Sequence, residues 1–284
     1  MRFCVVIPAY NEAATIRDVV TRALAVCDRV IVVDDGSTDG TAQALKNLPI
    51  TMLQHEVNFG KAAALWSGFE RALADGADAI ITLDGDRQHR PEDIPRFYEV
   101  AQRYPEHVII GSRITQRHAF PKQRYLANCT ANFWISWAAG YRIQDSQSGF
   151  RLYPATLLRR VRIPCDHAHG FVFESEILIE AARKGIHSIA LPIDAIYVAG
   201  ARPSHFRSVV DVLRITRMVA WKLLSRGMYP LGLLRAFGWP RREVLIATAH
   251  NREHVAAAPT PPFQTSDGSS PRQFPGSKIA GSKK

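Results

Sequence analysis

Residues 79–86 read Ala-Ile-Ile-Thr-Leu-Asp-Gly-Asp, a short apolar run that ends on two acidic residues. A continuous apolar run of this length, bounded by turn residues, is typical of a strand that is buried on both faces. Two other runs have the same form, Phe3–Pro8 before Tyr10-Asn11-Glu12 and Val30–Asp34 before Asp35-Gly36-Ser37. Because such runs alternate with longer helical patterns, the sequence predicts an α/β domain with a mostly parallel central sheet and helices on both faces.

The pattern places these elements along most of the chain. Strands are predicted at Phe3–Pro8, Val30–Asp34, Ile50–Gln54, Ala79–Asp84, Val108–Gly111, Phe150–Tyr153, Ser188–Pro192 and Ala195–Val198. Helices are predicted at Ala13–Cys27, Thr41–Leu48, Lys61–Ala74, Pro91–Tyr104, Pro121–Ala139, Phe173–Lys184 and Phe206–Arg226. In parallel sheets ligands bind outside the carboxyl ends of the strands. The acidic and small polar residues of this sequence follow three of the predicted strands, so we expect the functional site at that edge.

Charge and composition exclude several classes of protein. Residues 201–284 hold 14 Lys+Arg against 4 Asp+Glu, which accounts for the whole net charge of +10. The part of the chain that can build a large core is therefore neutral, and a nucleic-acid binder is not expected. The phosphate-binding patterns GxxxxGK[ST] and GxGxxG are absent. A signal peptide and a run of about 18 apolar residues are also absent, and the scattered cysteines indicate reduced thiols, so we expect a cytoplasmic protein.

The acids after the run at 79–84 have the composition of a cation site. Asp84 and Asp86 are two residues apart and can converge on one divalent ion, with Gln88 as a neutral third ligand. Mg²⁺ and Mn²⁺ prefer such oxygen ligands and leave positions open for substrate phosphates. The alternative is a simple Asp-Gly turn. The cluster Asp34–Thr41 likewise has two interpretations, a helix cap or a group that binds a nucleobase or ribose.

Four segments, taken in their order and spacing, resemble the family 2 glycosyltransferases: Val6–Glu12, Val33–Thr41, Asn58–Lys61 and Asp84–His89. Three more resemble the dolichyl-phosphate (polyprenyl-phosphate) mannosyltransferase-like branch: Gly111–Arg113, Ser148–Arg151 and Phe173–Glu176. The resemblance covers residues 3–200. It implies a GT-A type fold with a Rossmann-like sheet, and inverting transfer of a hexose from a nucleotide-sugar donor.

The resemblance also implies roles for individual residues. The residues that would surround the nucleoside are Pro8, Tyr10, Glu12, Asp35 and Lys61. Asp84 would lie beside the nucleotide, while Asp86 and Gln88 would hold Mg²⁺ or Mn²⁺ on the donor diphosphate. A divalent ion neutralises the charge that develops on the leaving nucleoside diphosphate, and in-line attack inverts the anomeric carbon. The intact ligand set argues against a nucleotide-sugar-binding protein without activity.

The acceptor determines whether a general base is needed. A polyprenyl phosphate or another lipid-linked phosphate is already anionic, so arginines that bind it suffice, and Arg113, Arg124 and Arg202 are the candidates. Ordinary surface ion pairing is the alternative for each of them. A hydroxyl group of a glycan, lipid or secondary metabolite would instead need a base. Asp145 is the best placed residue for that role, although a turn acid or a partner for an arginine fits it equally.

The basic C-terminal third contains one amphipathic helical pattern, Phe206–Arg226. Its predicted apolar side is formed by Phe206, Val209, Val210, Leu213, Ala220 and Leu224, and its basic side by Arg207, Arg214, Lys222 and Arg226. Such a helix is typical of one lying in the plane of an anionic membrane, and packing on the catalytic domain is the alternative. We therefore expect a catalytic domain at 1–203, a basic amphipathic segment at 204–239 and a disordered basic tail at 240–284. The protein is expected to bind peripherally at the cytoplasmic face of a membrane.

Overall fold

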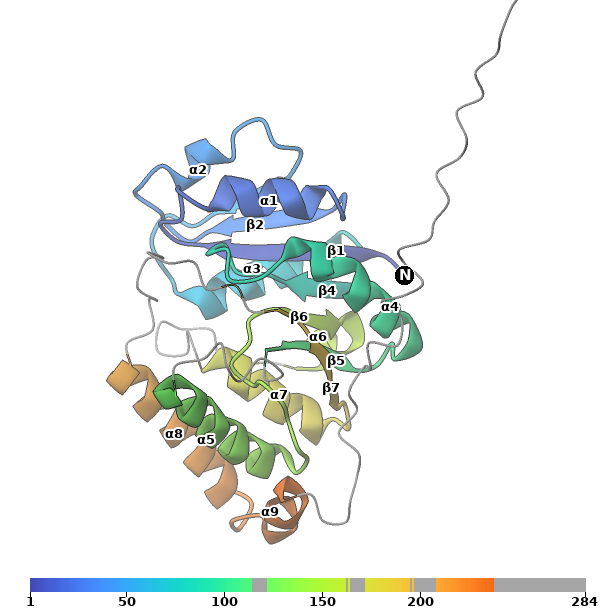
Figure 1. The fold of residues 1–284 in the computed structure, drawn as a ribbon, viewed down its shortest axis with the longest axis vertical. Helices are drawn as coiled ribbons and strands as arrows, with labels where there is room; N and C mark the ends of the chain where they lie inside the picture. Colours follow the sequence, from blue (N-terminus) through green and yellow to red (C-terminus); the bar gives the residue numbers. More distant parts are fainter. Residues whose placement is uncertain (114–121, 162, 164–171, 195, 197–207, 238–284) are drawn as a thin grey trace, which may run out of the picture. The chain divides into compact units, whose positions relative to one another are not determined.

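The computed structural model describes residues 1–113, 122–161, 163, 172–194, 196 and 208–237, and gives only the backbone for 122–125 and 208–213. Among these residues a single sheet has the strand order β3-β2-β1-β4-β6-β5-β7 (Figure 1). The strands are β1 (Phe3–Ala9), β2 (Val30–Asp34), β3 (Thr51–Gln54), β4 (Ala79–Thr82), β5 (Val108–Ser112), β6 (Arg151–Pro154) and β7 (Ser188–Pro192).

The strand order creates a switch point beside β1. The chain runs from β1 outward to β2 and β3, then returns to place β4 on the other side of β1. β1 pairs in parallel with both neighbours, so that Val6 lies opposite Ile31 on one side and Thr82 on the other. β6 is antiparallel to β4 and β5. The two crossovers therefore diverge at the carboxyl ends of β1 and β4, which is where open α/β sheets form their ligand crevice.

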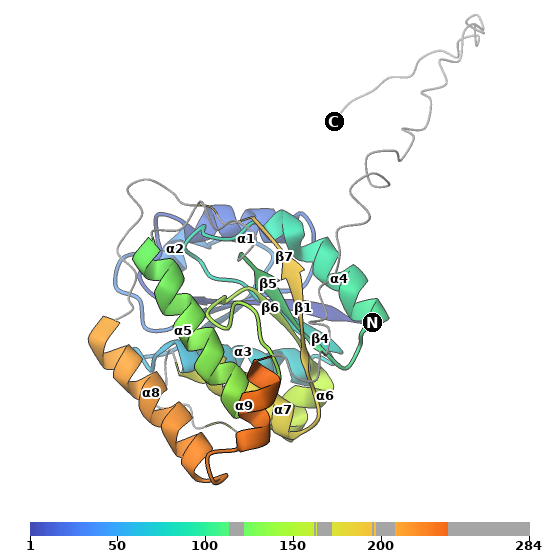
Figure 2. The ribbon, with the colours of Figure 1, turned by 60° about the horizontal axis from the view of Figure 1, so that its bottom comes forward.

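Helices cover both faces of this sheet (Figures 1 and 2). They are α1 (Ile16–Leu24), α2 (Thr41–Ala44), α3 (Lys61–Ala74), the 3₁₀ helix η1 (Pro91–Asp93), α4 (Ile94–Arg103), α5 (Lys122–Ala139), α6 (Ala155–Arg160), α7 (Phe173–Arg183), α8 (Ser208–Leu224) and α9 (Pro230–Ala236). The side chains of β1 alternate between two cores. Val5 and Ile7 pack with α1 and α4, whereas Val6 packs with α3 and with the core that extends to α5 and α7. Burial on both faces explains why the strand is apolar throughout.

The predicted α/β class, the mostly parallel sheet and the two helical layers are confirmed. Lys61–Ala74, Val30–Asp34 and Ser188–Pro192 have the predicted bounds. The first helix is shorter than expected, because the Glu12 carbonyl accepts the N–H groups of Thr15 and Ile16 in a turn that precedes it. The short helices α6 and α9 were not predicted.

Three expectations fall outside the residues that the structure describes. The predicted strand at 195–198 does so apart from its residue 196, and so do the boundary at 203/204 and the tail at 240–284. All of the described residues, including 208–237, belong to one compact unit. α5 packs against α7, α8 and α9.

Lys222 departs from the predicted basic side of α8, whose described members Arg214 and Arg226 are exposed. Val219 and Leu223 are buried, and between them Lys222 points into the protein, where it pairs with two glutamates of α7. The outer face instead carries Trp221, which is 70% exposed, and Leu224, which is 63% exposed. The face of α8 that packs on the protein is thus the one that carries Lys222, because α7 supplies acidic partners for this lysine.

Candidate active site

The loop after β4 brings its first acid against the loop before β6. Thr82 Oγ1 donates a hydrogen bond of 2.7 Å to the Gly149 carbonyl. Asp84 then lies so close to Gly149 that a Cβ atom added at Gly149 would be 2.4 Å from Asp84 Oδ2. Such a distance is far inside van der Waals contact, so the carboxylate can occupy this place only because residue 149 is a glycine.

Lys61 bridges two carboxylates at the same place. Its Nζ lies 2.7 Å from Asp84 Oδ1 and 2.8 Å from Glu174 Oε1. Lys61 is the first residue of α3 and Glu174 lies in the first turn of α7, so two helix beginnings meet at the carboxyl end of β4. Burial lowers the pKa of Lys61, but the two carboxylates outweigh it and raise the pKa, so the side chain is charged. Glu174 was not predicted as a site residue; its only signal was its place in the Phe173–Glu176 segment.

The second acid of the loop has a different environment. Burial, and then the neighbouring charge of Asp84, raise the pKa of Asp86 to about 6. Asp84 is partly buried, which opposes ionisation, yet the charge of Lys61 lowers its pKa. The Asp86 carboxylate accepts the Gln88 N–H at 3.0 Å. A cation shared by the two carboxylates would offset the repulsion that makes ionisation of Asp86 costly.

These acids fit the predicted Mg²⁺ or Mn²⁺. Their oxygen atoms are the hard ligands that such ions prefer. Within the described residues no group of three or more His, Cys, Asp and Glu side chains forms a complete metal centre. Asp84 and Asp86 would therefore supply part of a coordination sphere, and the predicted ligand Gln88 and substrate phosphates would supply the rest. An incomplete protein sphere is usual for Mg²⁺ sites that act on phosphates.

Arg113 and Asp145 form a buried ion pair at the end of β5. The guanidinium donates from Nε at 3.0 Å and from Nη2 at 2.9 Å to the two oxygens of Asp145, and the Arg113 N–H donates at 2.8 Å. The two residues are 7% and 2% exposed. Of the roles left open for Asp145, the structure therefore shows the partner of an arginine. A carboxylate that already accepts three hydrogen bonds is poorly placed to take a proton from a hydroxyl group.

Arg151 joins the loop that carries Asp145 to the start of α7. It is fully buried, and its guanidinium donates to the carbonyls of Ser146 and Ser148 at 2.7 Å each and to that of Glu174 at 2.5 Å. The first two carbonyls belong to the loop that carries Asp145, and the third opens α7. One side chain thus fixes the loop and the helix start relative to each other, a role that the sequence pattern did not reveal.

The loops after β1 and β2 interlock on the other side of the crevice. The Asn11 N–H donates to Ser37 Oγ, and the Glu12 N–H donates to Thr41 Oγ1, each at 2.8 Å. Gly85 lies beside this pair of loops, because a Cβ atom placed there would be 3.7 Å from Glu12 Cγ and 3.8 Å from the Pro8 carbonyl. Pro8 and Glu12 therefore lie next to the loop that carries Asp84 and Asp86, and Tyr10 follows β1 between them.

Asp35 organises the loop that leads to Lys61. Its carboxylate accepts hydrogen bonds from His55 Nδ1 at 2.7 Å and from the N–H groups of Phe59 at 2.9 Å and Gly60 at 2.7 Å. The loop after β2 and the loop before α3 approach closely at Gly36. This residue has φ +72°, and a Cβ atom there would be 2.6 Å from the backbone carbon of Val57. Of the other predicted site residues, the Arg124 side chain and Arg202 lie outside the described part of the chain.

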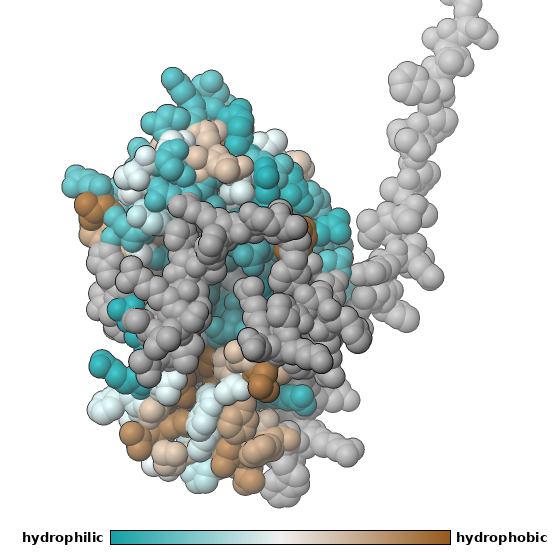
Figure 3. Space-filling view, turned by 60° about the vertical axis from the view of Figure 1, so that its left-hand side comes forward, coloured by the Kyte–Doolittle hydropathy of each residue, from teal (hydrophilic) through white to brown (hydrophobic). Residues whose placement is uncertain are grey.

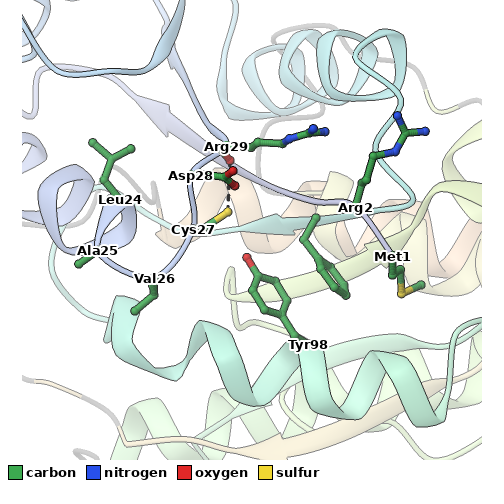
Figure 4. A pocket seen from close by; sticks show the side chains of 10 residues that line it. Met1, Arg2, Leu24, Ala25, Val26, Cys27, Asp28, Arg29 and Tyr98 are labelled. Carbon is green, nitrogen blue, oxygen red and sulfur yellow. Dashed lines mark hydrogen bonds between the residues drawn. The ribbon is translucent and has the colours of Figure 1, made fainter. Parts of the chain in front are cut away.

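A separate cavity of about 610 Å³ lies at the opposite edge of the sheet (Figure 4). It is lined by the start of β1, the segment from Leu24 to Arg29 and Tyr98. These residues stand at the amino ends of β1 and β2, away from the acids described above. Ligands of open α/β sheets bind at the carboxyl ends, so the group of residues around Asp84 is the candidate active site.

Solved structures support the fold. The structure of glucosyl-3-phosphoglycerate synthase from Mycobacterium tuberculosis, in complex with Mn²⁺, uridine diphosphate and glucosyl-3-phosphoglycerate, matches with a TM-score of 0.57. The match covers 79% of this chain and 79% of that chain at 22% sequence identity. At this identity the match establishes a shared fold, and it confirms the predicted GT-A type.

Sequence relatives identify the family. The chain is 30% identical over 213 residues to the UDP-N-acetylglucosamine–dolichyl-phosphate N-acetylglucosaminyltransferase of Methanococcus voltae, covering 68% of this chain and 84% of the relative. It is 28% identical over 204 residues to the polyprenol monophosphomannose synthase of Mycolicibacterium smegmatis, covering 68% and 76%. Residues 4–174, more than half of the chain, match the family described as Glycosyl transferase family 2. The predicted resemblance is thereby confirmed, and the chain belongs to glycosyl transferase family 2.

Proposed function

We propose that this glycosyltransferase moves a hexose from a nucleoside-diphosphate sugar to a polyprenyl phosphate, with inversion at the anomeric carbon. The observation that carries the proposal is the Arg113–Asp145 pair, in which the candidate base is engaged by an arginine. A phosphate acceptor is already a nucleophile and needs a cation to hold it, whereas a hydroxyl acceptor needs a base. The names of the two sequence relatives, which specify dolichyl phosphate and a polyprenol product, support the same acceptor class.

The site residues divide between donor and acceptor in this proposal. Asp84 and Asp86, with Gln88, hold Mg²⁺ or Mn²⁺, which when bound neutralises charge on the departing diphosphate. Pro8, Tyr10, Glu12 and Asp35 form the nucleoside side of the crevice together with Lys61. Arg113 binds the acceptor phosphate, assisted by Arg124 and Arg202. Asp145 keeps the Arg113 guanidinium in one orientation, since its carboxylate fixes both Nε and Nη2.

A donor and acceptor panel tests the reaction. GDP-mannose, UDP-glucose and UDP-N-acetylglucosamine are each incubated with the full chain, Mn²⁺ or Mg²⁺, and either a prenyl phosphate or a hydroxyl acceptor. We expect transfer to the prenyl phosphate from one donor, and loss of that transfer in EDTA or in Asp86→Ala. Substantial turnover in EDTA would refute the role of the metal. Transfer to hydroxyl acceptors alone, abolished by Asp145→Asn, would establish the alternative acceptor class.

The same acceptor implies a membrane, and one face of the protein is suited to it. The exposed large hydrophobic side chains of α5, α8 and α9 form what we call the apolar surface (Figure 3). Its members are Leu126, Trp134, Trp221, Leu224, Met228, Leu231, Leu234 and Phe237, which are 42% to 71% exposed. None of the helices within the described residues is long and apolar enough to span a membrane.

Charge around the apolar surface is mostly positive, although α8 also contains the acidic residue Asp211. Arg214, Arg217 and Arg226 are exposed on α8 and just beyond it. Residues 212–242 contain no Asp or Glu, and residues 126–139 contain no charged residue. An apolar centre with a cationic rim is the pattern of proteins that lie on an anionic bilayer. We therefore propose that this face, rather than a stripe of α8 alone, binds the cytoplasmic surface of an anionic membrane.

Flotation with liposomes tests this surface. The full chain is mixed with phosphatidylcholine vesicles that contain or lack phosphatidylglycerol. Partial insertion of two large side chains contributes about 2–3 kcal/mol, so Trp221→Ser/Leu224→Ser should lower partitioning at least about tenfold. Tyr104→Ser, which removes an exposed aromatic ring outside the apolar surface, is the matched control and should bind normally. Equal partitioning of all three proteins would overturn the proposed surface.

A further inference from the structure

Lys61 contacts one of the two acids that are assigned to the metal. Its ammonium group lies on Oδ1 of Asp84, one of the two acids assigned to the divalent ion. The Lys61 and Asp84 side chains are 21% and 25% exposed, so water screens this contact only in part. The same ammonium group contacts Glu174, whose side chain is 9% exposed. The lysine is therefore shared between the metal-binding loop and α7.

We propose that Lys61 is an internal counter-ion that competes with the divalent cation for Asp84, and that Glu174 is the positioning residue that retains Lys61 when the cation binds. The inference rests on the proposed function, because it assumes that Asp84 and Asp86 take a divalent ion. An ammonium group and a divalent ion repel each other strongly at contact distance in a partly buried site. Asp84 therefore cannot serve both fully at once.

Glu174 can keep Lys61 paired after the lysine leaves Asp84. It already contacts Lys61 at 2.8 Å, so the ammonium group need not move into solvent to release Asp84. Glu174 is itself held, because its carbonyl accepts a hydrogen bond from the buried Arg151. Rotation of a flexible lysine between two carboxylates is a small movement, whereas a shift of α7 would disturb the core around Phe173.

The arrangement links metal binding to donor binding. With Lys61 on Asp84, the acids carry less net negative charge, and the free protein should bind Mn²⁺ weakly. A nucleoside diphosphate brings negative charge that can satisfy both the lysine and the divalent ion. Each ligand should therefore increase the affinity for the other, because binding free energies that share a site are reciprocal.

Mn²⁺ binding to the full chain tests the proposal without any transfer reaction. Free Mn²⁺ is measured by electron paramagnetic resonance during titration of the wild type, Lys61→Met, Glu174→Gln and the double variant. Lys61→Met should bind Mn²⁺ at least about tenfold more tightly, which is the scale of one unit charge acting on a divalent ion across about 6 Å of water-like dielectric. Glu174→Gln should bind it more weakly by a similar factor, because Lys61 then pairs with Asp84 alone. Lys184→Met and Glu99→Gln, at exposed positions, are controls that should match the wild type.

The double variant separates competition from simple charge. It has the same net charge as the wild type, so a purely long-range effect predicts unchanged Mn²⁺ affinity. Competition for Oδ1 predicts tighter binding than wild type, because Asp84 is no longer occupied. Unchanged affinity in the double variant, or equal affinities in both single variants and wild type, would overturn the inference while leaving sugar transfer by the wild type intact. A wild type that neither binds Mn²⁺ nor transfers sugar would instead refute the proposed function.

Discussion

The Arg113–Asp145 pair gives the sharpest test of how the acceptor is activated. Both side chains are almost completely buried, and two side-chain hydrogen bonds of 2.9 and 3.0 Å join them. Removing one partner of such a pair leaves an unpaired buried charge and costs about 3–5 kcal/mol of folding free energy. We expect Asp145→Asn and Arg113→Met each to lower the free energy of unfolding by about 3 kcal/mol. The double variant should lose only slightly more than either single one, because it leaves no unpaired charge.

Activity should follow the same non-additive pattern. If Asp145 acts only by orienting Arg113, then adding Asp145→Asn to Arg113→Met changes kcat/KM for the prenyl phosphate by less than about threefold. If Asp145 is a general base, the added substitution removes a separate contribution, which is about 10²–10⁴-fold for proton transfer.

The assay is a double-mutant cycle measured twice, once by urea denaturation and once by initial rates. Rates are taken at a temperature where denaturation shows all four proteins to be folded. A coupling free energy of about 2 kcal/mol in both cycles is the expected result. Additive losses in kcat/KM, with strong coupling in stability alone, would contradict the positioning role and make Asp145 the base for a hydroxyl acceptor.

Three further outcomes are expected. Gly149→Ala should displace Asp84, since the new Cβ atom would lie 2.4 Å from its Oδ2. Mn²⁺ titrations and rate assays should then show binding and sugar transfer weakened about tenfold or more. Lys222→Met should lower the free energy of unfolding, measured by urea denaturation, by about 2 kcal/mol, because it leaves two glutamates of α7 without their shared cation. Lys184→Met, at an exposed site, is the control and should change that free energy by less than about 0.5 kcal/mol. Burial raises the pKa of the Cys4 thiol to about 12, so at pH 8 only about one group in 10⁴ is the reactive thiolate. After brief treatment with iodoacetamide, mass spectrometry should find Cys4 unmodified in the folded protein and modified in protein unfolded by urea.

Local signals account for what the sequence predicted well. The apolar run before Asp84 is continuous because β4 is buried on both faces, although the strand ends at Thr82, two residues before its predicted end. The helix Lys61–Ala74 has sharp bounds because Gly60, with φ +92°, adopts a conformation that other residues rarely take. Each of these features depends on neighbours within a few residues. The carboxyl-end position of the acids then followed from the general geometry of parallel sheets.

Contacts between distant segments account for what it could not predict. Lys61 and Glu174 are far apart in the sequence, and nothing local to either indicates that one ammonium group joins them across the site. Arg151 is harder still, because arginine is rarely buried completely and its partners here are backbone carbonyls rather than acids. Every residue has a backbone carbonyl, so the types of the partner residues do not reveal these hydrogen bonds. The family segments Ser148–Arg151 and Phe173–Glu176 were the only indication that these positions matter.

The error on α8 has a physical origin that also bears on the membrane. Helical periodicity ranks faces by hydrophobicity, and it placed Lys222 on the outside because an isolated lysine prefers water. Glu176 and Glu180 reverse that preference, since two carboxylates at 2.8 and 2.5 Å compensate the ammonium group for its lost hydration. Once Lys222 points inward, the helix must turn Trp221 and its neighbours outward. The ion pairs of Lys222 with α7 thus determine which side chains of α8 are exposed on the apolar surface that we propose binds the membrane, although no member of these pairs belongs to that surface.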